Sequence, residues 1–333
     1  MSKTQFNAWT LDEIDDAHAL TWDAFSVKYP TRSYDGWRIK RQRSVPSGVK
    51  REYLADKKIG DFHWRDANKV MADMIGLKDA ASFSQDYAHI RIESDKPVCV
   101  LSLSDTHIGS WSTDHSLFEQ ITDEILSTPN LYVALLGDFE QMAIKASQGV
   151  LAISDNLLPP ELQHRYIESW LGEIEHRVLF STWDNHAVMR EEAGSGFSQY
   201  ANLMKRRVVW HSGIGHPNVS INDETYRLAV SHRFRLRTHL NPVHGGMQYI
   251  RHEAPDREIS IAGDSHTPGI AHWTLGDSEK LSLNCGSTQL NSGYGKRFFS
   301  LTTHPIFPVC ILWPDKHRFV GLPSVADYIA LTT

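Results

Sequence analysis

The sequence predicts an α/β fold for most of the chain, preceded by a small all-α domain at the N-terminus. The chain has 333 residues, enough for about two domains of ordinary size. Hydrophobic residues make up 41% and charged residues 22%, as in globular proteins with a buried core. After Pro97, short apolar runs alternate with stretches of helical pattern, which is typical of an α/β domain.

The apolar runs are expected to be buried strands. They lie at 98–104, 131–137, 177–182, 226–231, 257–263, 280–285 and 308–313. None of them approaches the ~20 apolar residues that span a bilayer. The first ten residues, MSKTQFNAWT, lack the apolar stretch of a secretory signal. We therefore expect a cytoplasmic protein without a membrane partner.

The cysteines agree with that location. Cys99, Cys285 and Cys310 are odd in number, and each lies in an apolar run. This pattern predicts buried free thiols in a reducing compartment.

The chain is expected to divide into 1–45 (a helical domain), 46–96 (a linker and helix) and 97–333 (the α/β domain). In the first segment, Thr10 and Glu13 have the spacing of a capping box at the start of a helix. A second helix is expected over Trp22–Tyr29, and a third from Thr31 or Ser33. The short join between the first two leaves one long helix as an alternative.

Polar side chains of metal-ligand type follow five of the expected strands. They are Asp105 and His107, Asp138, Asn185 and His186, His232, and Asp264 and His266. Sheets of α/β proteins place their ligand sites at the carboxyl ends of strands. The i, i+2 spacing of Asp105 and His107 projects both side chains to one side of an extended segment. The mixed oxygen and nitrogen set suits Mn²⁺, Fe or Zn²⁺ better than Ca²⁺.

The order of these motifs, D-x-H, G-D, N-H, a lone His and G-x-x-H, resembles the calcineurin-like metallophosphoesterase superfamily over residues 97–315. The resemblance implies a β-sandwich flanked by helices and two divalent metal ions, with Mn²⁺ favoured and Mg²⁺, Fe or Zn²⁺ as alternatives. It implies that Asp105, His107 and His266 hold the first metal, and that Asp138 bridges both. Asn185 and His232 would hold the second metal, and His186 would be the catalytic residue that faces the substrate phosphate.

Two positions depart from the family pattern. Asp184 stands where a glycine is usual before Asn-His, and Asp264 stands where a histidine ligand of the second metal is usual. We interpret Asp264 as a substituted metal ligand. Other histidines remain rivals for the place of His232, and other arginines remain candidates to grip phosphate. The histidines are His211, His216, His239, His244 and His252, and the arginines are Arg190, Arg233 and Arg235.

The N-terminal stretch WDAFSVKYPTRSYDGWRIKRQRS looks like the last two helices of a Myb- or homeodomain-like helix-turn-helix. Trp9, Phe25, Trp37 and Ile39 would form its core. Its basic face toward DNA would consist of Arg38, Lys40, Arg41 and Arg43. The alternative is a helical hairpin that packs on the α/β domain, with solvated basic residues. Such fusions resemble phage proteins, which would place this one in the cytoplasm of a bacterial host.

The most favoured function is a DNA-directed phosphodiesterase or nuclease that uses a hydroxide activated by two metals. Two alternatives stay open. One is a phosphomonoesterase that acts on a nucleic-acid end, a nucleotide or a phosphoprotein. The other is a DNA-binding protein whose phosphoesterase domain is inactive.

Overall fold

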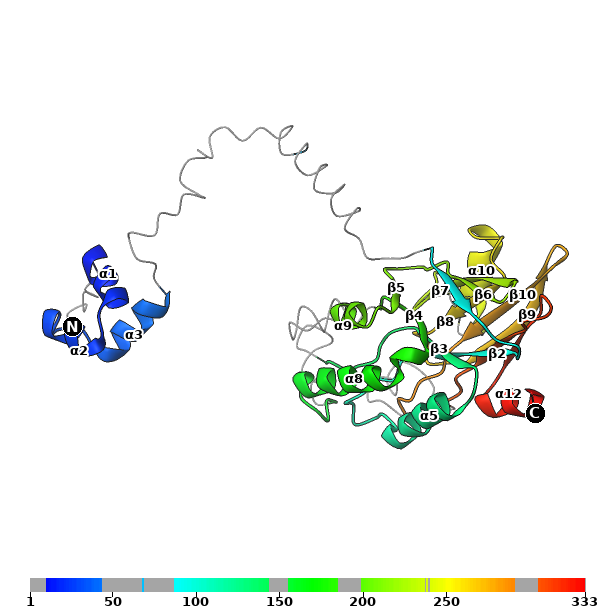
Figure 1. Cartoon of the computed structure of the whole chain (residues 1–333), viewed down its shortest axis with the longest axis horizontal. Coiled ribbons are helices and arrows are strands. Elements are labelled where there is room, and N and C mark those ends of the chain that lie inside the picture. Colours follow the sequence, from blue (N-terminus) through cyan, green and yellow to red (C-terminus); the bar gives the residue numbers. More distant parts are fainter. Residues whose placement is uncertain are drawn as a thin grey trace. The chain divides into compact units, whose positions relative to one another are not determined.

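The computed structural model describes residues 10–43, 68, 87–143, 155–184, 199–236, 238, 240–290 and 305–332. The chain divides into two units, Met1–Ser82 and Phe83–Thr333, whose elements are labelled in Figure 1. Within the described ranges, no helix is long and apolar enough to cross a membrane.

The described part of the first unit, residues 10–43, contains three helices, α1 (Leu11–Ala19), α2 (Trp22–Lys28) and α3 (Tyr34–Arg43). The expected capping box is confirmed: Glu13 N donates to Thr10 Oγ1 at 3.2 Å, and Thr10 N donates to Glu13 Oε2 at 2.7 Å. Leu20 and Thr21 have extended backbone between α1 and α2. The alternative of one long helix is therefore wrong.

Aromatic side chains form the core of this unit. Phe25 is fully buried, and Trp22 contacts it with ring centroids 6.3 Å apart. Trp22 also packs against Trp37 of α3 at 5.9 Å and against Tyr34 at 5.4 Å. Of the expected core, Phe25 and Trp37 thus contribute, whereas Trp9 and the side chain of Ile39 lie outside the described part.

The described residues of the second unit form two six-stranded sheets. The first has the order β1-β6-β7-β8-β10-β9, with β1 His89–Ile92, β6 Asn218–Ile221, β7 Glu224–Ser231, β8 Ile259–Ala262, β10 Ser278–Asn284 and β9 Gly269–Leu275. The second has the order β12-β11-β2-β3-β4-β5, with β12 Phe319–Leu322, β11 Val309–Leu312, β2 Val98–Leu103, β3 Leu131–Leu135, β4 Val178–Thr182 and β5 Val209–His211. The pairs β2–β3, β3–β4, β4–β5, β7–β8 and β8–β10 are parallel.

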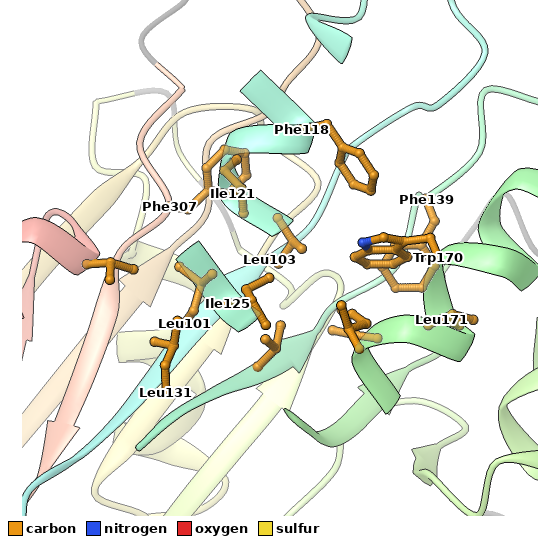
Figure 2. Close-up of a cluster of buried hydrophobic side chains, with 14 of the residues drawn as sticks. Leu101, Leu103, Phe118, Ile121, Ile125, Leu131, Phe139, Trp170, Leu171 and Phe307 are labelled. Atoms are coloured by element: carbon orange, nitrogen blue, oxygen red, sulfur yellow. The ribbon is translucent and has the colours of Figure 1, made fainter. Parts of the chain in front are cut away.

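The sheets pack face to face and helices cover their outer faces. The helices are α5 (His115–Ser127), α8 (Pro160–Ile174), the 3-10 turn η2 (Glu175–Arg177), α9 (Gln199–Lys205), α10 (His244–His252) and α12 (Val325–Thr332). Val98 and Val100 of β2 belong to the core between the sheets, with Val230 and Ile261. The alternate residues Leu101 and Leu103 face α5 and α8, as Figure 2 shows. Figure 1 shows α10 beside the other sheet.

The expected fold class is confirmed, as are all seven expected strands. The sequence did not predict β1, β5, β6, β9 and β12. Because β1 pairs with β6 inside the first sheet, the α/β unit starts before the expected boundary at residue 97. The expected linker and helix over 46–96 lie outside the described residues as far as 86, except for Asn68. Cys99, Cys285 and Cys310 are free and buried, as predicted.

Candidate metal centre

The carboxyl ends of four strands meet at one place. Asp105 and His107 follow β2, and Asp138 follows β3. His232 follows β7 directly, and His266 comes shortly after β8. Backbone hydrogen bonds join these strand ends: Asp105 N donates to Gly137 O at 3.0 Å, and His107 N donates to Asp138 O at 3.1 Å. The two sheets contribute jointly, since β2 and β3 belong to one and β7 and β8 to the other.

Two overlapping groups of side chains there have the composition of metal ligands. Asp105, His107 and His266 form the first group, and Asp105, Asp138 and His232 form the second. In the first, His266 Nε2 lies 3.2 Å from Asp105 Oδ1 and 3.1 Å from His107 Nε2. In the second, His232 Nε2 lies 3.5 Å from Asp138 Oδ2. Asp105 is the residue that both groups contain, whereas Asp138, expected to be the shared one, belongs to the second only.

The ligand-bearing turns have left-handed backbone. The φ angles are 54° at Asp105, 44° at His107, 52° at Asp138, 65° at Asp264 and 54° at His266. Each such angle costs a non-glycine residue about 1–3 kcal/mol, which the surrounding structure must offset. The expectation that Asp105–His107 is extended is therefore wrong. The two side chains still converge, with His107 Nε2 3.9 Å from Asp105 Oδ1, because a tight turn brings them together.

Two glycines permit the close approach of these turns. Gly137 has φ 93°, and a Cβ there would lie 2.4 Å from the Cβ of Asp184. A Cβ on Gly263 would lie 2.2 Å from Ser104 Oγ and 2.8 Å from Asp105 Oδ2. A larger residue at either position would push the strand ends apart.

A hydrogen bond orients His232 for coordination. Its Nδ1 lies 2.7 Å from the carbonyl oxygen of Leu136. Because a carbonyl only accepts, Nδ1 carries a proton, and Nε2 is the ring nitrogen that faces Asp138 and is placed to bind a metal ion once its own proton is lost. Both His232 Nε2 and Asp105 Oδ1 are buried, and neither forms a hydrogen bond with the residues that the structure describes. Such atoms are costly unless another partner, such as a metal ion, satisfies them.

The electrostatics of the two carboxyl groups differ. Burial raises the pKa of Asp138 to about 7, with Asp184 adding to the rise and the His232 imidazole opposing it. Burial also acts to raise the pKa of Asp105, but the positive charge of His266, His232 and His107 outweighs it and holds this pKa below its usual range. Asp105 is therefore anionic at neutral pH even before any cation binds.

The donor set fits a divalent cation. Ligand atoms bound to one metal at about 2.1 Å lie about 3.0–3.4 Å from one another. The separations of His266 Nε2 from Asp105 Oδ1 (3.2 Å) and from His107 Nε2 (3.1 Å) fall in this range. Carboxylate oxygens with imidazole nitrogens suit Mn²⁺, Fe or Zn²⁺.

Comparison with protein-family models finds no match, and comparison with curated proteins finds none either. Solved structures do resemble this chain in fold. One is Vacuolar Protein Sorting 29 from Cryptosporidium parvum, at 15% identity and a TM-score of 0.38, covering 69% of this chain and 100% of its own. Another is a metallophosphoesterase from Sphaerobacter thermophilus, at 13% identity and a TM-score of 0.35, covering 70% and 92%. These values do not by themselves assign a family or an activity.

A third resemblance is to Vps29 from Entamoeba histolytica, solved as a zinc complex, at 12% identity and a TM-score of 0.32, covering 68% of this chain and 98% of its own. The zinc belongs to that protein. In this chain, the two groups of aspartate and histidine side chains offer the place for a metal ion.

Several expected site residues lie elsewhere or outside the described part. Asn185, His186 and Arg190 fall in the segment 185–198, which the structure does not describe. Asp264 belongs to neither group of described ligands, although its Oδ1 lies 3.8 Å from His232 Nε2. Its role as a metal ligand stays a prediction.

The rival histidines that the structure describes, His211, His216, His244 and His252, are not members of either group. Nε2 of His216 lies 2.8 Å from the hydroxyl of Tyr249, and Nε2 of His252 lies 3.0 Å from Gln248 Oε1. His239 falls outside the described residues. Of His232 and its described rivals, His232 is thus the one that belongs to a ligand group.

Asp184 has a structural role that the sequence did not predict. Its Oδ2 accepts a hydrogen bond from the backbone N–H of Asp138 at 3.0 Å, and the side chain is buried. The one signal in the sequence was its departure from the usual glycine.

The expected DNA-binding residues lie on α3. Arg38 is exposed, with Nη2 3.8 Å from Asp35 Oδ1. The side chains of Lys40, Arg41 and Arg43 are outside the described part. Their role toward DNA stays a prediction.

Proposed function

We propose that this chain is a metal-dependent phosphoesterase that holds two divalent metal ions at the ends of β2, β3, β7 and β8. The observation that carries the proposal is the pair of ligand groups that share Asp105. Asp105 Oδ1 and His232 Nε2 support it, because both are buried and form no hydrogen bond within the described part of the chain. Asp105, His107 and His266 would hold one ion, and Asp105, Asp138 and His232 the other.

Two bound divalent ions supply positive charge to a phosphoryl group and lower the pKa of water. Neighbouring residues of the chain orient the candidate metal ligands before any ion binds. Leu136 O accepts from Nδ1 of His232, so Nε2 is the ring nitrogen that would bind a metal ion. Asp184 fixes the turn that presents Asp138. From the family resemblance, His186 would stabilise the phosphate charge or donate a proton to the leaving oxygen.

The test is metal content measured together with hydrolysis. The purified full-length chain is loaded with Mn²⁺ or Zn²⁺, and bound metal is measured by elemental analysis. We expect two ions per chain, and loss of both metal and activity in His107→Ala and Asp138→Asn. His252→Ala, at an exposed histidine that bonds to Gln248, is the control and keeps both. A wild-type chain without bound metal would contradict the proposal.

The substrates in that test separate the two ester classes. We propose that the chain is a phosphodiesterase acting on DNA, so bis(p-nitrophenyl) phosphate is hydrolysed faster than p-nitrophenyl phosphate. Faster hydrolysis of the monoester would favour the phosphomonoesterase alternative. His186→Ala should keep both metals and lose about 10²–10⁴ in rate. Loss of metal in this variant would make its assigned role wrong.

The DNA part of the proposal rests on the basic stretch that begins in α3. Between Asp35 and Glu52 the sequence contains no acidic residue, and Arg38 is exposed. Four to six phosphate contacts would give a log–log salt slope of roughly −4 to −5 for duplex binding. Deletion of residues 1–50 should remove this salt-dependent affinity while small esters are still hydrolysed. Equal DNA affinity with and without the segment would contradict DNA binding by this unit.

A further inference from the structure

The segment after β7 places an arginine beside the ligand groups. Arg233 directly follows His232, and its Nε lies 3.6 Å from Asp264 Oδ2. The other oxygen of Asp264 lies 3.8 Å from His232 Nε2. Asp264 thus lies between a candidate ligand and Arg233, whose side chain is 59% exposed.

The backbone of this segment is anchored on both sides. Ser231 Oγ donates to Arg233 O at 3.1 Å, and Arg233 N donates to the same hydroxyl at 3.3 Å. Phe234 is buried and packs with Ala229 and Ala262 of the two adjacent strands. The backbone that carries the Arg233 side chain is therefore held in place.

This anchored segment also borders a pocket. Residues 233–236 line the pocket, and the first of them, Arg233, directly follows the candidate ligand His232 at the end of β7. Arg233 and Arg235 are exposed on either side of the buried Phe234. An anion in this pocket would meet positive charge without a large rearrangement of the backbone.

We propose that Arg233 binds the anionic oxygens of the substrate phosphate, and that Asp264 is a positioning residue that orients it rather than a ligand of the second metal. The inference rests on the proposed function and names a substrate-binding group for it. With Nε held by Asp264, the terminal N–H groups of the guanidinium are left to form paired hydrogen bonds with phosphate oxygens.

The charges of the pair are consistent with this role. Asp264 has one negative charge at a position where the family pattern has a neutral histidine. Arg233 lies beside it and its positive charge offsets that negative charge. The site then stays attractive to an anionic phosphate despite the extra carboxylate.

The test uses the full chain loaded with Mn²⁺ and measures the affinity for inorganic phosphate by isothermal titration calorimetry. Arg233→Ala and Asp264→Asn should both keep the wild-type metal content. Arg233→Ala should weaken phosphate binding about tenfold to a hundredfold, as expected for charged hydrogen bonds. With an ester substrate, KM should rise more than kcat falls. Arg91→Ala, at an exposed arginine on β1, is the matched control and should change neither quantity.

A double variant separates positioning from direct ligation. If Asp264 acts through Arg233, the double variant Arg233→Ala with Asp264→Asn should bind phosphate no more weakly than Arg233→Ala alone. Asp264→Glu, which keeps the carboxylate, should recover part of the affinity that Asp264→Asn loses.

Three results would overturn the inference. They are loss of about one metal ion per chain in Asp264→Asn, an unchanged phosphate affinity in Arg233→Ala, and additive effects in the double variant. Each arises only in a chain that binds metal. A wild-type chain that binds no metal would instead overturn the proposed function, and this inference with it.

Discussion

The turn that presents Asp138 is held by a side chain from another strand end, Asp184. The backbone N–H of Asp138 donates to Asp184, and a Cβ on Gly137 would collide with the same side chain. Asp184 therefore occupies the space that Gly137 leaves open, and it braces a turn with left-handed φ angles. Side chains that support metal ligands in this way commonly change metal affinity when they are replaced.

We predict that Asp184→Ala weakens metal binding about tenfold to a hundredfold, because the Asp138 turn loses its hydrogen bond. Asp184→Asn retains an oxygen that accepts from Asp138 N, so it should recover most of the affinity. Calorimetric titration of the apoprotein with Mn²⁺ measures the change. Asp277→Ala, in an exposed turn, is the control. A wild-type dissociation constant in Asp184→Ala would contradict the supporting role.

At the scale of the elements, α5 and α8 hold the sheet face from which Asp138 extends. Trp170 of α8 donates from Nε1 to Thr122 Oγ1 of α5 at 3.0 Å. Its ring packs 5.0 Å from Phe118 and 6.2 Å from Phe139, the residue after Asp138. Figure 2 shows Trp170 and Phe118 over the side chains of β2. The helix layer thus stabilises the strand ends as well as the core.

Trp170→Ala should lower the free energy of unfolding by about 3–5 kcal/mol, because it opens a cavity and leaves Thr122 without its donor. Urea denaturation followed by circular dichroism measures this loss. Leu162→Ala on the same helix, whose residue is 46% exposed, should change it by less than about 0.5 kcal/mol. Equal losses of unfolding free energy in the two variants would contradict the stabilising role of the Trp170 packing.

The helices of the first unit are tied by Glu13 and Arg32. Two hydrogen bonds join the side chains, at 2.9 Å from Nε and 2.8 Å from Nη2. The bonds from Arg32 hold the pKa of Glu13 below its usual range, against the opposing effect of burial. Glu13 also closes the capping box of α1, so one carboxylate stabilises both the helix and the link to the segment before α3.

This lowered pKa predicts the direction of a pH effect. The stabilisation is fully present above the ordinary glutamate pKa of about 4.3, and it is lost as the pH falls through the lowered value. Glu13→Gln should cost the unit about 1–2 kcal/mol and reduce its acid sensitivity. Hydrogen exchange of amides 10–43, corrected for intrinsic rates, measures this in the full chain. The exposed Asp12→Asn should keep the wild-type pH dependence.

At the scale of the whole molecule, the two units should respond differently to metal. The ligand groups lie entirely in the second unit, Phe83–Thr333. A ligand that binds the folded form stabilises it by about 2.7 kcal/mol at a concentration of 100 times its Kd. Metal should therefore stabilise one unit and leave the other unchanged.

We predict that Mn²⁺ raises the thermal transition of the second unit and that a chelator reverses the increase. Hydrogen exchange of residues 10–43 should be the same with and without metal. Calorimetry of the wild type and of Asp138→Asn measures the shift, which the variant should lack. Metal-dependent protection of residues 10–43 would mean that the metal acts on both units.

The sequence by itself determined the local features. The buried strands β2, β3, β4, β7, β8, β10 and β11 stand out as apolar runs because both of their faces are covered, and the capping box of α1 depends only on residues three apart. The polar residues that follow those strands could also be predicted, because the end of each apolar run is visible in the sequence. The strand β9, with its half-exposed pattern, and the three-residue β5 produce no comparable signal.

Only the tertiary structure decided which of these residues meet. Asp105 belongs to both ligand groups because the ends of β2, β3, β7 and β8 are brought together by two sheets, which no local pattern records. The contact of Asp264 with Arg233 likewise depends on the parallel pairing of β7 with β8. Periodicity reports which face of a strand is buried, whereas the neighbours of its last residue depend on strand order and on turns with left-handed backbone. The site's chemistry was therefore predictable by residue type, and its geometry was not.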